Sequence, residues 1–306
     1  MTPPADAPVV AALGSPESAG QVVRLAAREA AGHRRPLRLL HAFNWSAALE
    51  APSVIGPRAR AEELLEQAAA AAGEAEPAVP VSGEIVEGAP VAALVRRSES
   101  AFLVVIGDGG MARCGACIPA DAPAVQLAAR AGCPVLVVRP EPPPQGPVLV
   151  GVDGSASSRT ALAFAFGCAA RRSARLLAVR VVEPPPEDRP PDTAGTPPGT
   201  DPNGPHGRHD AYDRHGLGTA HAELADVVAR CGRRHPEVSV ECHVVVGDPG
   251  AVMVEQSRSA QLTVVAARGD EPLRGMLGAV SQSLLYHSPA PVIVVRGLVS
   301  TAPGGA

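Results

Sequence analysis

The chain contains no lysine. Its 27 basic residues are all arginine, and they face 31 acidic residues in a formal net charge of −4. So small an imbalance gives no reason to expect a nucleic acid or a charged membrane surface as a partner. Hydrophobic residues make up 46% of the 306 residues, which is enough for ordinary globular cores.

Long apolar runs are also missing. No stretch approaches the roughly 20 residues that a membrane-spanning helix needs, and the N-terminus lacks the basic region and apolar core of a signal peptide. Six cysteines in 306 residues do not make a disulfide framework. We therefore expect a cytoplasmic protein with no membrane partner.

Catalytic signatures are absent as well. The chain has no Ser-His-Asp order, no P-loop lysine and no H-E-x-x-H motif, so we assign no catalytic residue and no metal ligand. Cys168, Cys231 and Cys242 lie on apolar stretches or near helix ends, where cysteine usually fills a core.

One order of elements occurs twice along the chain. Each copy alternates apolar strands with helices through five strands, which predicts an α/β fold with a parallel, doubly wound sheet. Four pairs of positions mark the repeat: Leu13 with Asp153, Gly88 with Gly247, Gly110 with Gly269, and Pro134 with Pro291. The number of residues that separate the two partners increases from the first pair to the second. The second copy therefore contains an insertion between Asp153 and Gly247.

The repeat predicts two domains. In chain order we expect an N-terminal domain over 1–139, a proline-rich linker over 140–147, a C-terminal domain over 148–297 and a tail over 298–306. The insertion, at about 184–218, is rich in proline and glycine and is expected to be disordered. The alternative is a weak metal site of His206, His209, Asp210 and His215, which flexible spacing and a missing hydrophobic shell disfavour.

A glycine-rich loop follows the fourth strand of the second copy. Leu262 to Ala266 is expected to form a buried strand, and Ser281 to cap a helix that runs to about His287. A loop followed by a helix N-terminus favours an anion such as phosphate. In a doubly wound sheet, ligands bind outside the carboxyl ends of the strands.

The last strand of each copy, Val135–Val138 and Val292–Val295, is apolar and is expected at a sheet edge. A bare apolar edge invites pairing. In one chain the two edges can pair with each other and form a pseudo-dimer. A further homodimer of two such chains stays an alternative.

Several motifs occur in the same order in both copies. They are Val150–Ser155, Val246–Pro249, Val264–Val265 with the loop through Ser281, and Pro289–Val295, with weaker copies at Val86–Pro90, Val104–Gly107 and Cys133–Val138. In this order the chain resembles the universal stress protein family in tandem form, over all but the insertion and the tails. The resemblance implies two Rossmann-like, adenine nucleotide alpha hydrolase-like domains, each with a five-stranded parallel sheet.

The same resemblance implies an ATP site. ATP-binding members carry Gly, two residues, Gly, nine residues, then Gly with Ser or Thr, and an Asp after the first strand. The second copy has Ala266, Gly269, Gly278 and Ala279 at the loop positions, with a spacer one residue short, and it keeps Asp153. The residues that would bind ATP, with Mg, are Val152, Asp153, Val181, Arg268, Gly269, Arg274, Gly278, Ala279, Val280 and Ser281.

The first copy departs further from that pattern. Leu13 stands at the aspartate position, and Asp121 follows Ala120 where the family has a hydroxyl residue. Two like charges about 4 Å apart repel by roughly 1 to 4 kcal/mol, so Asp121 would oppose phosphate. We expect the first copy to have lost nucleotide binding.

The leading interpretation is a cytoplasmic stress-response regulator that binds ATP weakly in its C-terminal domain only. It would not be an enzyme, beyond a residual ATPase. One alternative is an interaction module with an unknown protein partner and no nucleotide. Another is a redox switch at Cys114 and Cys117, a C-x-x-C pair in the first copy.

Overall fold

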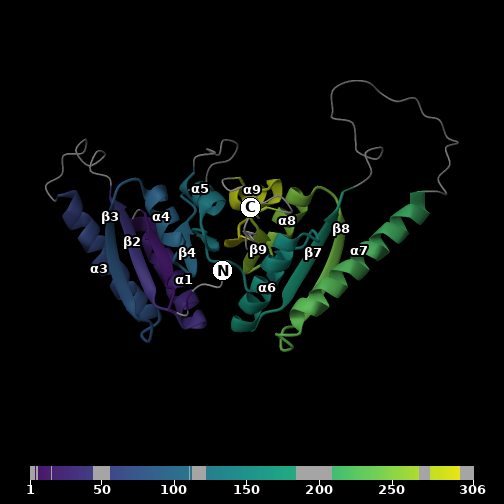
Figure 1. Cartoon of the computed structure of the whole chain (residues 1–306), viewed down its shortest axis with the longest axis horizontal. Coiled ribbons are helices and arrows are strands. Elements are labelled where there is room, and N and C mark those ends of the chain that lie inside the picture. Colours follow the sequence, from purple (N-terminus) through teal and green to yellow (C-terminus); the bar gives the residue numbers. More distant parts are fainter. Residues whose placement is uncertain are drawn as a thin grey trace, which may run out of the picture.

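The computed structural model describes residues 4, 6–14, 16–43, 56–109, 111, 122–183, 209–268 and 276–296. Within these residues one sheet of ten strands runs through the whole molecule, in the order β3-β2-β1-β4-β5-β10-β9-β6-β7-β8. The strands are β1 Val9–Leu13, β2 Leu37–Phe43, β3 Val81–Glu87, β4 Leu103–Gly107, β5 Val135–Val138, β6 Val148–Gly151, β7 Leu176–Val182, β8 Val240–Val246, β9 Leu262–Ala266 and β10 Val292–Val295. In Figure 1 the two halves of the sheet lie side by side.

Helices cover both faces of this sheet. They are α1 Pro16–His33, α3 Pro57–Ala75, α4 Pro90–Ser98, α5 Pro123–Arg130, α6 Ala156–Arg171, α7 His209–Gly232, α8 Pro249–Ser257 and α9 Ala279–His287. Buried residues of α1, α3, α6 and α7 share one core with alternate strand residues. Those of α4, α5, α8 and α9 share a second core on the opposite face. Because both faces are covered, the central strands can be apolar throughout.

Within each half, here β1–β5 and β6–β10, all strands are parallel. The first strand of each half pairs with the second and the fourth, β1 with β2 and β4 and β6 with β7 and β9. The strand order reverses at that first strand, which is the switch point of a doubly wound sheet. The predicted fold class, two five-stranded parallel units, is confirmed.

The two halves meet where β5 pairs antiparallel with β10, with Val292 opposite Val137 and Val294 opposite Val135. Every residue of both strands is buried. The pairing leaves neither apolar edge open, so the chain carries two domains on one continuous sheet.

Arg139, the residue after β5, reaches across this junction. Its side chain is 2% exposed. It donates hydrogen bonds to the carbonyl oxygens of Leu284 at 2.9 Å and Leu285 at 2.7 Å, near the C-terminus of α9, where the last carbonyls lack helical N–H partners. The Leu284 carbonyl also accepts the N–H of the C-cap residue Ser288. Asp108 Oδ2, 3.9 Å away, balances the charge. Burial lowers the pKa of Arg139 to about 10, against the opposing effect of Asp108, so the group stays charged at neutral pH.

A second contact across the junction is aromatic. The His33 ring at the end of α1 lies 4.3 Å from the Phe102 ring and 6.3 Å from the Phe164 ring of α6, measured between centroids. Burial, with repulsion from Arg171, Arg35 and Arg172, lowers the pKa of His33 to about 3. His33 is therefore neutral in the folded protein.

Three helix boundaries differ from the sequence expectations. Helix α7 begins at His209 rather than Thr219, so the last part of the expected disordered insertion is helical. Extending a packed helix costs far less than nucleating one, so the glycines at 216 and 218 are tolerated. Composition predicts a helix over Arg58–Ala72 that Gly73 ends, whereas α3 continues through Gly73 to Ala75, because Ala72 is fully buried and anchors its last turn.

The third difference concerns α9, which begins at Ala279 with Gly278 as its N-cap, three residues before the expected cap, Ser281. The segment 184–208 and the Cys114/Cys117 pair lie outside the described residues, as do the side chains of His209, Asp210 and His215.

Replacing Arg139 tests the cross-junction cap. Arg139→Met removes the hydrogen bonds to the carbonyls of Leu284 and Leu285 and the buried cation 3.9 Å from Asp108, and we expect the free energy of unfolding to fall by about 3–5 kcal/mol. Urea denaturation followed by circular dichroism measures it. The double variant Arg139→Met/Asp108→Asn should recover part of the loss. A single-variant cost below about 1 kcal/mol would show that the cap contributes little.

His33 predicts a pH dependence. The pKa of His33 is lower in the folded protein than in the unfolded chain, so only the unfolded chain takes up the proton as pH falls below about 6.5. The free energy of unfolding therefore falls by up to about 1.4 kcal/mol per pH unit. Between pH 7.5 and 5 the wild type should lose about 2 kcal/mol more than His33→Gln. The exposed His243 supplies the control, since His243→Gln should keep the wild-type slope. If the free energy of unfolding depends on pH equally in the wild type and both variants, the lowered pKa of His33 is contradicted.

Candidate functional site

The candidate site lies at the carboxyl ends of β6 and β9. These strands are neighbours and run parallel, with Val150 opposite Val264, so the segments after them emerge at the same edge of the sheet. Asp153 follows β6, and the loop leading to α9 follows β9. The aspartate predicted from sequence and the N-terminus of α9 are therefore brought to one edge.

Asp153 is exposed and is held in a tight turn. Its Oδ1 accepts a 2.9 Å hydrogen bond from the backbone N–H of Ser155, and Gly154 between them has φ +87°, which favours glycine. Partial burial raises the pKa of Asp153, but hydrogen bonds from Ser155 and Ser158 outweigh it and hold that pKa below its ordinary value. The site therefore presents a carboxylate at neutral pH.

The N-terminus of α9 has no side-chain cap. Gly278 occupies the N-cap position and makes no side-chain bond, whereas Ser155 caps α6 and Asp248 caps α8. The N–H of Gly278 is bound to the carbonyl of Ala267 at 2.8 Å. The N–H groups of the first turn of α9 point to the sheet edge with the positive end of the helix dipole, which suits an anion.

Ser281 does not have either role expected from sequence. It is 2% exposed, and its Oγ donates a 2.6 Å hydrogen bond to the carbonyl of Ala266 at the end of β9. The N-cap is Gly278, and the Ser281 hydroxyl ties α9 to β9. Ser281 therefore supports the loop and leaves the missing hydroxyl at Ala279 unreplaced.

The other predicted site residues divide into three groups. Val181 and Val280 are half-buried against the α8–α9 core, on the side of the loop. Val152 is buried in the opposite core, so it offers the site its backbone only. Arg268 is half-buried, with one guanidinium nitrogen 3.8 Å from the sulfur of Met276. Ala279 is exposed, and Gly269 and Arg274 lie outside the described residues.

The corresponding edge of the N-terminal half has different chemistry. Leu13, at the position of Asp153, is 5% exposed and belongs to the α1–α3 core. After β4 comes Asp108, 6% exposed and 3.9 Å from Arg139. The carboxylate on this side is thus used in the junction between the halves. Gly110, Ala120 and Asp121 lie outside the described residues.

Comparison with known proteins agrees with this architecture. The model of the universal stress protein family matches the chain twice, over residues 7–139 and 146–296. The chain belongs to the universal stress protein family. Universal stress protein Rv2623 of Mycobacterium tuberculosis is 32% identical over 313 residues, which cover 94% of this chain and 96% of that protein. The predicted resemblance to the tandem form is confirmed.

The fold is also that of a solved structure. A universal stress protein from Archaeoglobus fulgidus has a TM-score of 0.59 at 16% identity, covering 94% of this chain and 96% of its own. Another from the same organism, solved in complex with dAMP, covers 43% of this chain and 96% of its own, with a TM-score of 0.33 and 21% identity.

Sequence reasoning missed three features of this universal stress protein. The first is the support of Asp153 by Ser155 and Ser158, which the Asp-Gly-Ser turn could have indicated. The second is the Asp108–Arg139 pair, which depends on two residues 31 positions apart and on the other half of the chain. The third is the structural bond of Ser281. The last two have no local sequence signal.

The cysteines that the structure describes are free thiols. Burial raises the pKa of Cys133 to about 12 and that of Cys168 to about 11, and both are buried, so they are poor nucleophiles. Cys168 fills the core as expected, while Cys231 and Cys242 are half-buried at its margin.

The described part of the chain offers neither a metal cluster nor a membrane span. No group of three or more histidine, cysteine or acidic side chains there could hold a metal ion. None of its helices has the length and apolar character needed to cross a membrane.

Ser281→Ala tests the structural role of that hydroxyl. Removing it leaves the buried carbonyl of Ala266 without its partner, and we expect a loss of about 1–3 kcal/mol in the free energy of unfolding. Ser283→Ala, on the same helix, should change it by less than about 0.5 kcal/mol. Chemical denaturation measures both, and equal effects would contradict the role.

Proposed function

We propose that this universal stress protein is a cytoplasmic stress-response regulator that binds ATP, with Mg, weakly and in its C-terminal half only. The observation that carries the proposal is the ionised Asp153 at the same sheet edge as the uncapped N-terminus of α9. One group accepts hydrogen bonds and the other donates them. A nucleotide, with a donor-rich nucleoside and an anionic phosphate chain, matches both.

The phosphate end is assigned to the α9 side. The first-turn N–H groups of α9 and the dipole favour negative charge, and the half-buried Arg268 follows β9, where a guanidinium can bind phosphate oxygens in pairs. Ala279 supplies no hydroxyl to the phosphate. The missing hydrogen bond weakens the binding free energy by about 0.5–1.5 kcal/mol, or by somewhat more because phosphate is charged. Weak rather than tight binding follows.

The nucleoside end is assigned to Asp153 and Val181. Asp153 accepts hydrogen bonds from ribose hydroxyls or an amino group, and Val181, half-buried at the end of β7, offers an apolar surface to the base. The N-terminal half has no such pair, because Leu13 is packed into the core. We therefore assign one site to the chain rather than two.

The proposed role is binding rather than catalysis. A general base works best with a pKa near the operating pH, whereas hydrogen bonds from Ser155 and Ser158 hold that of Asp153 below its ordinary value. The Ser281 hydroxyl is already bound to Ala266. The described site thus supplies an acceptor and a phosphate cradle without an activated nucleophile.

Isothermal titration of the full chain with ATP and Mg tests the proposal. We expect binding at millimolar ATP, weakened about tenfold or more in Asp153→Asn, since a charged acceptor is lost. Asp226→Asn is the control, because Asp226 is an exposed acid on α7 paired with Arg230, and it should bind like the wild type. No heat at millimolar ATP would reject nucleotide binding and favour the alternative, an interaction module whose partner binds regardless of ATP.

A further inference from the structure

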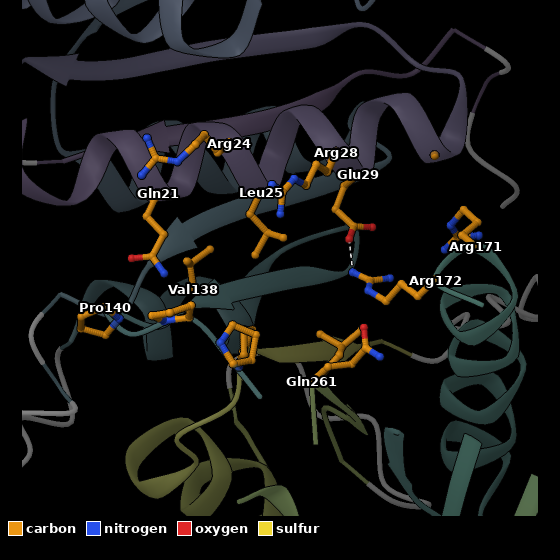
Figure 2. Close-up of a pocket in the computed structure, with 15 residues that line it drawn as sticks. Gln21, Arg24, Leu25, Arg28, Glu29, Val138, Pro140, Arg171, Arg172 and Gln261 are labelled. Carbon is orange, nitrogen blue, oxygen red and sulfur yellow. Dashed lines mark hydrogen bonds and ion pairs between the residues drawn. The ribbon is translucent and has the colours of Figure 1, made fainter. Parts of the chain in front are cut away.

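A cavity of about 650 Å³ lies between the two halves, away from the candidate ATP site. Its walls are α1, the end of α6, the linker after β5, and the residues that precede β9 and β10. Gln261 and Leu262 place it at the amino end of β9, whereas the Asp153 site lies at the carboxyl end. Figure 2 shows Gln21 and Leu25 of α1 pointing toward Val138 and Pro140 across this space.

The cavity is strongly cationic. Four arginines line it, Arg24 and Arg28 from α1 and Arg171 and Arg172 at the end of α6, together with a single acid, Glu29. Glu29 is 4% exposed and is already paired with Arg172, as the dashed line in Figure 2 marks. The lining therefore holds a surplus of positive charge, in a chain whose net charge is −4.

Arg24 and Arg28 are available to a ligand. Both are exposed, and neither forms an ion pair with any residue that the structure describes. Like charges four residues apart on a helix destabilise it by about 0.2–0.5 kcal/mol. The positive potential reaches further, since Arg171 and Arg172 help to lower the pKa of the neighbouring His33.

Much of the remaining lining is apolar, alongside the amide side chains of Gln21 and Gln261. Leu25, Val138 and Leu262 contribute aliphatic surface, and prolines form much of the rim, namely Pro140, Pro142, Pro143 and Pro291. The linker is fixed where it reaches β6: Gln261 donates a 2.5 Å hydrogen bond to the carbonyl of Gly146. A Cβ at Gly146 would lie 1.8 Å from the carbonyl oxygen of Ser259, so glycine is required there.

We propose that this cavity binds a small organic anion that carries phosphate or several carboxylates on an apolar body. The guanidinium groups match the oxygens of such an anion, and the leucine, valine and proline surface matches its body. The volume lies within the range of small-molecule sites. Because α1, α6 and the linker all line the cavity, the ligand contacts both halves and stabilises their association.

Fluorescence titration with 1-anilinonaphthalene-8-sulfonate, an apolar ring system with one sulfonate, tests the site in the full chain. We expect saturable binding, displacement by inorganic pyrophosphate, and a rise in Tm with pyrophosphate. Arg24→Gln/Arg28→Gln should weaken the binding of the dye and of pyrophosphate at least tenfold. Both residues are exposed, so the variant should fold, and each single variant should show part of the loss.

Arg233→Gln/Arg234→Gln is the matched control, because it removes two exposed arginines beyond α7 and should bind the dye and pyrophosphate like the wild type. Equal weakening by both pairs, or no weakening by the cavity pair, would overturn the proposal. So would binding of polyglutamate without binding of the dye or pyrophosphate, which would indicate an acidic protein partner. Asp153→Asn should leave the dye titration unchanged, so this test does not depend on ATP binding.

Discussion

The antiparallel pairing of β5 with β10 is the constraint on which the rest of the structure depends. Each half ends in a short, fully buried, apolar strand, which would be an open edge if the half stood alone. Joining the two edges makes one sheet and brings α1 close to α6. It also places Arg139 of the first half under the last turn of α9 in the second. The cross-junction cap, the aromatic contact of His33 and the cationic cavity all follow from this pairing.

The two halves share a backbone plan but differ in their sheet edges. The equivalent position at the end of the first strand of each half is Asp153 in the second half and Leu13 in the first, the former exposed and the latter packed into the core. A buried leucine stabilises its domain by about 1.5–3 kcal/mol, whereas an exposed carboxylate at a sheet edge adds little to packing. In the first half this position therefore serves packing, and the nearby acid Asp108 lies 3.9 Å from Arg139 at the junction.

Most of the fold could be predicted from the sequence because its signals are local. Apolar runs such as Leu262–Ala266 indicated buried strands, and their alternation with helices indicated the parallel sheet. Errors arose where the signal was weak. Helix α9 starts at a glycine without a capping side chain, and α7 extends through two glycines. The candidate site was predicted in position but not in detail, because the bond of Ser281 to Ala266 depends on how the loop closes. The role of Arg139 and the cavity depends on the other half of the chain.

The two proposed sites lie at opposite ends of β9, and the nature of that strand determines how they can interact. All of its residues are buried, and it pairs with β6 on one side and β10 on the other. Such a strand has one packed arrangement, whereas coupling between two sites requires a structural element that can adopt two arrangements. An anion in the cavity contacts both halves and so acts on their association, while a nucleotide contacts one half only. We therefore expect the two ligands to bind independently, unless the junction itself opens.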